Sequence, residues 1–267
     1  MTVPAFGART GEAAPNANDL LAELGGGPSR FWRWLGTPAL LAAACVALYL
    51  YGRTQELDSI SQASLNAGTI REKLIEHVQL TFVSTLIVVL LAVPLGVLLT
   101  RPGARRFSPA VLAVANIGQA TPSIGVLVLM AITVGIGFDK AVYALVIYAA
   151  LPVLRNTIVG LTQVDRTLVE AGRGMGLSGW QVLRRVELPL SVPVVLAGIR
   201  TALIINVGTA TLATFVGAGG LGFLIDQGIR FDRMPVLITG SVLTAVLALL
   251  LDWAAGIVED VLRPKGL

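Results

Sequence analysis

The residues that could carry out chemistry are few in this chain of 267 residues, and they stand apart from one another. There is one histidine, His77, and one cysteine, Cys45, which lies inside an apolar run. A hydrolytic or metal site needs several His, Cys, Asp or Glu side chains close together, so we expect neither a metal site nor a disulfide framework. Arg200 and Asp252 are two ionisable residues inside long apolar segments. Two roles are favoured for them, either snorkelling toward the membrane surface or a mutual ion pair that fixes two helices, with substrate contact as the alternative.

A polar stretch between two apolar segments, residues 165–189, carries the most distinctive pattern of side chains. It reads DRTLVEAGRGMGLSGWQVLRRVELP, and its helical pattern weakens at Gly174 and Gly176. Gly176 can adopt the left-handed conformation that closes a helix, and Ser178 can cap a second short helix. Pro189 is expected to end that second helix and to begin the next apolar segment. The pattern predicts a compact knob of two short helices; an amphipathic loop lying on the lipid surface is an equal alternative.

The composition indicates a membrane protein. Of the chain, 55% is hydrophobic and 13% is charged, with a mean hydropathy of +0.78, whereas soluble domains carry roughly 25% charged residues. Several apolar runs reach the ~20 residues that cross a bilayer as a helix. We therefore expect an all-α integral membrane protein with about six transmembrane helices. The six segments cover residues 35–51, 78–100, 109–137, 141–161, 192–216 and 236–258.

Two of these segments are interrupted. Residues 119–123 (QATPS) divide the third segment, and residues 217–222 (GAGGLG) end the fifth. A short helix is expected after that break, over residues 221–229. The whole chain is then expected to consist of a disordered cytoplasmic tail (1–29), an anchor helix with an extracytoplasmic loop (30–76), a transmembrane domain (77–258) and a second cytoplasmic tail (259–267).

The distribution of Lys and Arg orients the chain in the membrane. Six spans place both ends on one side; if that side is the cytoplasm, thirteen of the twenty basic residues face inward and six face outward, with Arg200 inside a span. Membrane proteins usually carry the excess of Lys and Arg on the cytoplasmic side. We therefore expect a multi-pass protein of the plasma membrane with both termini and residues 165–189 in the cytoplasm. No nucleic-acid partner is expected, because this asymmetry accounts for the net charge of +4.

The spacing within residues 165–189 resembles the signature loop of the inner-membrane permeases of binding-protein-dependent ABC importers. That signature is Glu-Ala-Ala, three residues, Gly, nine residues, Ile, one residue, Leu-Pro. Gly172 stands where the family has its second alanine, and Val186 stands where it has isoleucine. In that family the loop forms the coupling helices, which dock into a groove of the cytoplasmic ATPase. The resemblance implies an ATPase-coupling role for Glu170, Ala171, Gly172, Gly176, Trp180, Arg184, Leu188 and Pro189.

A longer part of the chain, from about His77 to Val258, is similar to the permeases of osmoprotectant importers. The similar stretches are QATPS (119–123), LPVLRN (151–156), VELPL (186–190), AGIRT (197–201), GTATL (208–212) and VGAGGLG (216–222). The resemblance implies the permease subunit of an ABC importer for glycine betaine, choline, carnitine or proline. An importer of another small solute, such as an amino acid, is the alternative.

The resemblance also implies the partners of this chain. They are a cytoplasmic ABC ATPase, a second permease chain that is identical or homologous, and an extracellular or periplasmic substrate-binding protein. The chain has no Walker A sequence, so we do not expect it to be an enzyme or to hold a cofactor. ATP and Mg²⁺ belong to the ATPase.

Small and polar residues inside the spans are candidates for lining a pore. At the break in the third segment, a pore lining and a buried structural kink are equal alternatives, because irregular backbone at membrane depth must be buried or line a cavity. On the fifth segment, close helix packing is favoured over pore lining. The pore candidates are Gln119, Thr121, Pro122, Ser123, Asn206 and Thr209, and the candidates for a gate or outer loop are Gly217, Gly219, Gly220 and Gly222.

Two other classes of membrane protein fit the sequence less well. An ion-coupled secondary transporter would need ion-coupling residues inside the membrane and internal repeats, and the spans offer only Arg200 and Asp252. A membrane-embedded enzyme would need a cluster of acid, base or nucleophile, whereas His77 stands alone at the edge of a segment.

Overall fold

The computed structural model describes residues 30–262, with side chains from Trp34 onward. These residues form helices and no strand, as the sequence predicts. The expected tail 1–29 and the last five residues of the expected tail 259–267 lie outside the described residues. The long helices are α2 (Arg30–Thr54), α4 (Ala67–Leu99), α7 (Phe138–Thr162), α10 (Leu188–Ala210) and α12 (Met234–Leu262). The shorter elements are α3 (Ser59–Ser64), η1 (Arg105–Phe107), α5 (Ser108–Ala120), α6 (Ser123–Thr133), α8 (Arg166–Gly174), α9 (Gly179–Val182), η2 (Leu183–Glu187), η3 (Leu212–Val216) and α11 (Gly222–Arg230).

Among the described residues, five helical stretches are long and apolar enough to cross a membrane, and one bent pair brings the number to six. The pair consists of α6 and of η1 with α5, and its two arms meet at 95° across the break at Thr121 and Pro122. The six segments expected from the sequence are thus present, and the third is sharply bent where the QATPS stretch interrupts it.

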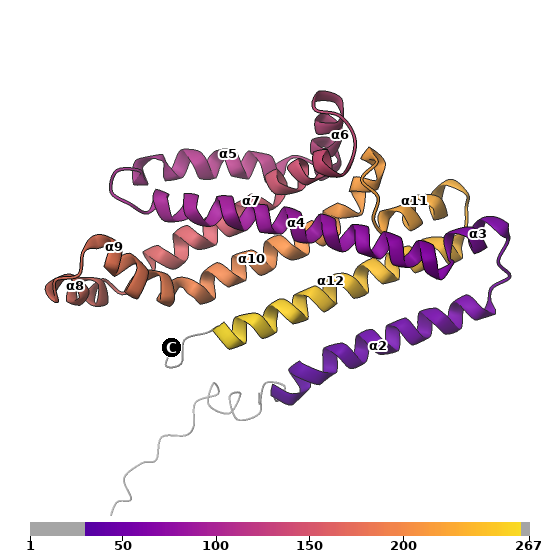
Figure 1. The fold of residues 1–267 in the computed structure, drawn as a ribbon, viewed down its shortest axis with the longest axis horizontal. Helices are drawn as coiled ribbons and strands as arrows, with labels where there is room; N and C mark the ends of the chain where they lie inside the picture. Colours follow the sequence, from indigo (N-terminus) through magenta and orange to yellow (C-terminus); the bar gives the residue numbers. More distant parts are fainter. Residues whose placement is uncertain (1–29, 263–267) are drawn as a thin grey trace, which may run out of the picture.

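Helix α7 forms the centre of the bundle. α10 and α4 pack most extensively against it, and α5 and α6 also lie against it (Figure 1). A Cβ atom added to Gly198 of α10 would lie 2.7 Å from the Asn156 Cβ and 2.8 Å from the Pro152 carbonyl oxygen, both on α7. Gly96 of α4 approaches Thr157 of α7 in the same way. Close backbone contact at small residues is what holds membrane helices together, since lipid is as apolar as the core.

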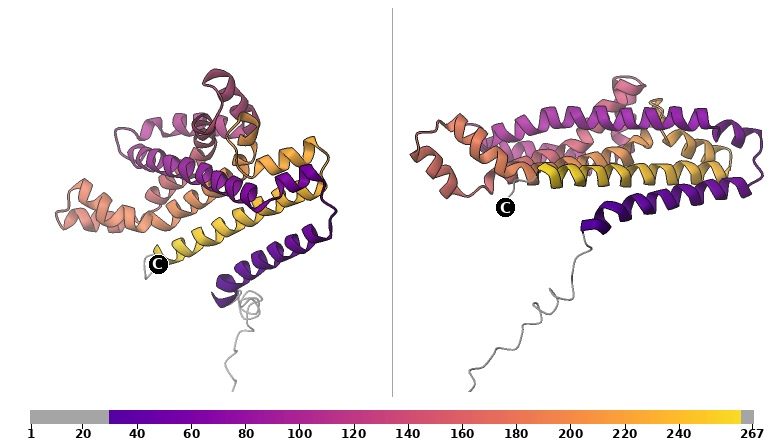
Figure 2. Two further views of the ribbon diagram at one scale, coloured as in Figure 1. Left: turned by 45° about the vertical axis from the view of Figure 1, so that its right-hand side comes forward. Right: turned by 60° about the horizontal axis from the view of Figure 1, so that its bottom comes forward.

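Helix α2 lies at the edge of the bundle, alongside α12 (Figures 1 and 2). Its large side chains Leu40, Val46 and Leu50 are exposed. Outward-facing apolar side chains are expected where a helix faces lipid rather than water. Because α2 makes few contacts with the rest of the bundle, it is an addition to the core that α4, α7, α10 and α12 form.

The helix that begins at Gly179 does not end at Pro189, contrary to the expectation from the sequence. α9, the π-helical η2 and α10 form one continuous stretch, Gly179–Ala210. A proline inside an α-helix removes a hydrogen bond and clashes with the carbonyl four residues earlier. Here a π turn precedes the proline, and the Leu188 N–H bonds to the Leu183 carbonyl. The wider turn gives the proline ring room, so the helix continues.

Part of the region expected to be an extracytoplasmic loop is helical. α3 and the first turns of α4 occupy it, and α4 starts at Ala67 instead of near Val78. Asn66 caps α4 by accepting a hydrogen bond from the Thr69 N–H at 2.8 Å. Hydropathy detects the apolar part of a helix, whereas the cap sets where the helix begins.

Candidate functional site

The polar loop, residues 165–189, projects from one end of the bundle and contains α8 and α9 (Figure 1). Asp165 caps α8 by accepting a hydrogen bond from the Thr167 backbone N–H at 2.8 Å. This bond, helped by the Thr167 side chain, holds the pKa of Asp165 below its ordinary value. Ser178 caps α9 in a reciprocal arrangement in which its own N–H bonds to the Gln181 side chain at 2.8 Å. The cap predicted at Ser178 is therefore confirmed.

The turn between α8 and α9 depends on Gly176. Its φ angle is +84°, and the N–H of the next residue, Leu177, bonds back to the Gly172 carbonyl at 3.1 Å. This is the left-handed helix end predicted for Gly176. Gly172 is buried, and a Cβ added there would lie within 3.5–3.7 Å of Val182, Leu177 and Val186. The two short helices are thus packed on each other as a compact unit.

The outer side of the polar loop carries exposed apolar and charged side chains. Trp180 is 67% exposed, and Met175 and Leu168 are also exposed. Trp180 therefore does not share the buried side of α9 and η2, where Val182 and Leu183 lie. Glu170, Ala171, Arg184 and Arg185 are exposed as well. Within the described part of the chain, Glu170 makes no hydrogen bond or ion pair, so its carboxylate is available to a partner.

A buried carboxylate that the sequence analysis missed anchors the base of the polar loop. Glu187 of η2 is 8% exposed, and its Oε2 lies 2.5 Å from Arg101 Nη2 in the turn after α4. Leu188 and Pro189 follow it as the first residues of α10. The clue in the sequence is the charged residue inside the apolar run VELPL, but its partner lies 86 positions away.

The pore candidates fall into two separate groups. Thr121, Pro122 and, in part, Gln119 and Ser123 reach the surface at the bend between α5 and α6. Asn206 is fully buried, and its Nδ2 bonds to Thr85 Oγ1 of α4 at 3.0 Å; Thr209 is also buried. The structure therefore places Asn206 and Thr209 within helix packing, the favoured alternative, and a pore role would require them to become exposed.

The outer loop, residues 217–222, connects η3 to α11 and lies toward the end of the bundle opposite the polar loop (Figure 1). Gly217, Gly219 and Gly220 have φ angles of +73°, +77° and +88°. Gly222 has no room for a side chain, since a Cβ there would overlap the Thr211 carbonyl. The short helix expected over residues 221–229 is present as α11.

His77 is not an isolated residue at a membrane edge, as the sequence suggested. It is fully buried in α4, and both ring nitrogens are within hydrogen-bonding distance of backbone groups near the outer loop. The neighbouring Glu76 also contacts this loop. The sequence did not reveal these contacts of Glu76 and His77, because the groups that they contact are more than a hundred positions away. No group of three or more His, Cys, Asp or Glu that could hold a metal ion occurs among the described residues.

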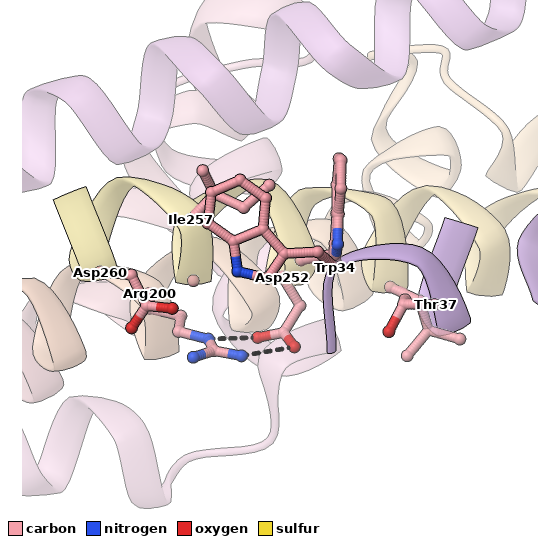
Figure 3. A pocket seen from close by; sticks show the side chains of 9 residues that line it. Trp34, Thr37, Arg200, Asp252, Ile257 and Asp260 are labelled. Carbon is pink, nitrogen blue, oxygen red and sulfur yellow. Dashed lines mark hydrogen bonds and ion pairs between the residues drawn. The ribbon is translucent and has the colours of Figure 1, made fainter. Parts of the chain in front are cut away.

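Of the two roles favoured for Arg200 and Asp252, the structure shows the ion pair. Arg200 Nε lies 2.5 Å from Asp252 Oδ1 and Nη2 lies 2.8 Å from Oδ2, so the guanidinium and the carboxylate pair through two parallel bonds. Glu259 is 3.5 Å from Arg200 Nη1. The pair lines a cavity of about 210 Å³ between α10, α12 and α2, where Trp34 and Asp260 also point inward (Figure 3). It ties α10 to α12, as the sequence predicts.

Comparison with known proteins gives the family. Residues 92–264 match the family described as binding-protein-dependent transport system inner membrane component. The chain is 39% identical over 202 residues to the glycine betaine/carnitine/choline transport system permease protein OpuCB of Bacillus subtilis, covering 76% of this chain and 92% of that protein. It is 45% identical over 176 residues to the osmoprotectant import permease protein OsmY of Salmonella typhimurium, covering 66% and 75%.

A solved structure agrees with this family. The chain is similar to a chain of the MetNI methionine ABC transporter in inward-facing conformations, with a TM-score of 0.64, 30% sequence identity, and coverage of 73% of this chain and 96% of that chain. The described residues contain five helical stretches that are long and apolar enough to cross a membrane, or six with the bent pair. Together with them, these similarities identify a multi-pass membrane protein. The chain belongs to the family of binding-protein-dependent transport system inner membrane components.

Proposed function

We propose that this chain is the permease subunit of an ABC importer for osmoprotectants of the glycine betaine, choline, carnitine or proline type. The observation that carries the proposal is the similarity to permeases named for such solutes, at 36–45% identity over most of the chain. An importer for an amino acid is the second candidate, favoured by the similarity to the MetNI methionine transporter at 30% identity. The higher identities to the osmoprotectant permeases favour the first candidate.

The polar loop is the proposed contact with a cytoplasmic ABC ATPase, which binds ATP and Mg²⁺. Its two helices are capped, joined by a left-handed turn at Gly176 and packed on each other. The loop can therefore move as one unit when an ATPase displaces it. Trp180, Met175 and Leu168 supply exposed apolar area, and Glu170 and Arg184 supply unpaired charge. Buried aromatic anchors surrounded by polar contacts are typical of strong protein interfaces.

In this proposal the polar loop and both chain ends are cytoplasmic, and the outer loop faces the opposite side. The start of α2 and the end of α12 lie toward the end of the bundle that carries α8 and α9 (Figure 1). The excess of Lys and Arg on that side agrees with the positive-inside rule. A substrate-binding protein would then approach the outer loop, which contains Gly217, Gly219, Gly220 and Gly222.

A second permease chain is proposed to complete the translocation pathway. The bend at Gln119, Thr121, Pro122 and Ser123 interrupts the helix and reaches the surface of the single chain. Broken backbone at membrane depth needs a polar or protein neighbour rather than lipid. An identical or homologous permease beside this bend would provide that neighbour and place the four residues at the pathway.

Reconstitution tests the proposed function. The chain is purified with the ATPase and the binding protein from neighbouring genes, placed in proteoliposomes, and supplied with labelled glycine betaine, choline, carnitine, proline or methionine. We expect ATP-dependent uptake of at least one of the first four solutes and none of methionine. Uptake of methionine alone would support the amino-acid alternative, and uptake without the ATPase would contradict both.

A further inference from the structure

Two neighbouring side chains of α4 hold the outer loop. Glu76 Oε2 accepts a hydrogen bond from the Gly220 N–H at 2.8 Å, and His77 Nδ1 accepts one from the Leu221 N–H at 3.2 Å. On the other side of the ring, His77 Nε2 lies 3.0 Å from the Val207 carbonyl oxygen. These contacts join α4, the last turn of α10 and the start of α11, which are far apart in the sequence.

The hydrogen bonds define the protonation state of His77. A backbone N–H always donates and a backbone carbonyl always accepts, so Nδ1 must be unprotonated and Nε2 must carry the proton. The residue is fully buried, which keeps water from its ring. His77 is therefore a neutral connector between two backbone groups, and buried groups of this kind almost always keep a partner.

The glycines of the outer loop make this close approach possible. Gly219 and Gly220 both have positive φ angles, which residues with side chains rarely adopt. A Cβ on Gly219 would overlap the Glu76 carboxylate, and a Cβ on Gly220 would lie 3.1 Å from His77 Nδ1. The two glycines and the two side chains of α4 are therefore complementary in shape.

Glu76 is itself held in place by a cation. Lys73, one turn earlier on α4, lies 3.0 Å from Glu76 Oε1, and its ammonium is 5.2 Å from the ring centre of Phe223 on α11. A cation at this distance from an aromatic face is attracted to it. The outer loop and α11 are thus attached to the same turns of α4 by several independent contacts.

We propose that Glu76 and His77 are positioning residues that keep the outer loop fixed on α4 throughout transport. The outer loop would then be a fixed surface that contacts the binding protein, and not a gate that moves away from α4. The assignment of a binding protein to this surface rests on the proposed function. Release of the loop from α4 would break the bonds of the Gly220 and Leu221 N–H groups to Glu76 and His77. His77 Nδ1 is buried and would lose its partner, which disfavours release.

The first test observes the contact directly. His77 is the single histidine of the chain, so ¹⁵N-histidine labelling of the full-length protein in nanodiscs gives the signals of one imidazole. We expect the Nε2–H tautomer, with Nδ1 showing the shift of an unprotonated nitrogen that accepts a hydrogen bond. An Nδ1–H tautomer, or a rapid average of both, would contradict the proposal. The measurement needs no substrate, so its outcome does not depend on the proposed function.

The second test replaces the contact by a covalent bond. The His77 Cβ lies 3.6 Å from where a Cβ on Gly220 would be, and disulfides need about 3.5–4.5 Å. The variant His77→Cys/Gly220→Cys is made in a Cys45→Ser background, with each single variant as a control. The readout is the concentration of substrate-loaded binding protein that half-maximally stimulates the ATPase of the complex.

We expect the reduced double variant to need about tenfold more loaded binding protein for half-maximal stimulation. Without His77 the outer loop is no longer held in one position, and misplacement of a contact surface lowers its effectiveness by such factors. Oxidation should return the value toward that of the Cys45→Ser parent, because the disulfide holds the loop where His77 held it. Pull-down of the ATPase should not change in either state, since the polar loop is at the other end of the bundle. A merely structural defect would not be reversed by the disulfide.

Three outcomes would overturn the proposal. Loss of ATPase stimulation on oxidation would mean that the loop must leave α4 during transport. Stimulation equal to that of the Cys45→Ser parent in the reduced double variant, or no improvement of that variant on oxidation, would mean that the contact does not position the loop. Glu76→Gln gives an independent reading, because it keeps an acceptor oxygen for the Gly220 N–H and should retain more stimulation than Glu76→Ala. Equal behaviour of these two would also count against the proposal. If osmoprotectant-loaded binding protein does not stimulate the ATPase of the complex with the Cys45→Ser parent, the result counts against the proposed function. The tautomer of His77 would still test the contact.

Discussion

Gly176 is the residue that sets the shape of the polar loop, and its substitution gives the first prediction. A β-branched residue at a φ of +84° is strained, at a cost of about 1–2 kcal/mol. Gly176→Val should therefore abolish substrate-stimulated ATP hydrolysis and uptake in proteoliposomes while the protein still reaches the membrane. Gly176→Asn is the matched control, because asparagine tolerates the left-handed region, and it should keep most of the activity. Normal coupling in the valine variant would show that the turn does not matter for transport.

In the proposed function, Trp180 is the side chain that we expect to contribute most to ATPase binding. Its ring is 67% exposed in this chain. Tryptophan side chains are frequent among the residues that dominate binding energy once a partner buries them. Trp180→Ala should weaken ATPase binding by about 2 kcal/mol, roughly thirtyfold, when the interaction is titrated in nanodiscs. Phe231→Ala removes another exposed aromatic ring, at the opposite end of the bundle, and should leave this affinity unchanged. Equal loss in both variants would place the ATPase contact elsewhere.

Among the elements, the junction of η2 with the turn after α4 depends on one ion pair. Arg101 and Glu187 have side-chain exposures of 33% and 11%, so removing one partner leaves the other charge partly buried. Because the arginine is about a third exposed, the expected loss is only about 1–2 kcal/mol of unfolding free energy. Glu187→Ala and Arg101→Ala should each show it, and a double-mutant cycle should give a clear coupling. Additive losses would mean that the two residues act independently.

The contact between α7 and α10 gives a prediction with a control in the same helix. A Cβ at Gly198 would lie 2.7 Å from the Asn156 Cβ, whereas a Cβ at Gly208 would meet nothing within 4 Å. Gly198→Ala should lower stability by about 1–3 kcal/mol by forcing the helices apart. Gly208→Ala should be neutral or slightly stabilising, since alanine favours a helix more than glycine does. Thermal unfolding of both variants in the same detergent makes the comparison, and equal melting temperatures would contradict it.

At the scale of the whole molecule, one helical stretch connects the two functional ends. Residues Gly179–Ala210 run from the polar loop to the turn beside the outer loop, a length of about 48 Å at ~1.5 Å per residue. The end near the outer loop carries Val207, whose carbonyl bonds to His77. A displacement of the polar loop by an ATPase would therefore act on one helical stretch that reaches the turn beside the outer loop. The π turn at Leu183–Glu187 and Pro193 are the places where this stretch can bend.

The orientation of the molecule gives the last prediction. Arg173 is exposed on the polar loop, at the end of the bundle that we assign to the cytoplasm. In a Cys45→Ser background, Arg173→Cys should react with a membrane-impermeant thiol reagent only in inverted vesicles. Arg230→Cys, exposed at the other end, should react only in intact cells or spheroplasts. The reverse pattern would overturn the topology and with it the cytoplasmic role of the polar loop.

The sequence by itself determined the features whose causes are local. Apolar runs of about twenty residues predicted the helices, because a single apolar segment can satisfy its own backbone hydrogen bonds in lipid only as a helix. Glycine at 176 and serine at 178 predicted the turn and the cap, since both depend on residues within a few positions. Arg200 and Asp252 could be paired because a lone charge inside an apolar segment needs an opposite charge. The coupling role of the polar loop, which followed from resemblance, stays a prediction.

The tertiary structure alone decided the contacts that join distant parts of the chain. Nothing local in the sequence relates His77 to Leu221 or Arg101 to Glu187, because their hydrogen bonds exist only once the helices have packed. The same packing buries Asn206 against Thr85, a position that the small-residue stripe left open between pore and interface. Residue type and spacing indicate which groups need partners. Only the arrangement of α4, α7 and α10 determines which partners they find, because the neighbours of a side chain depend on how the helices pack and not on the order of residues along the chain.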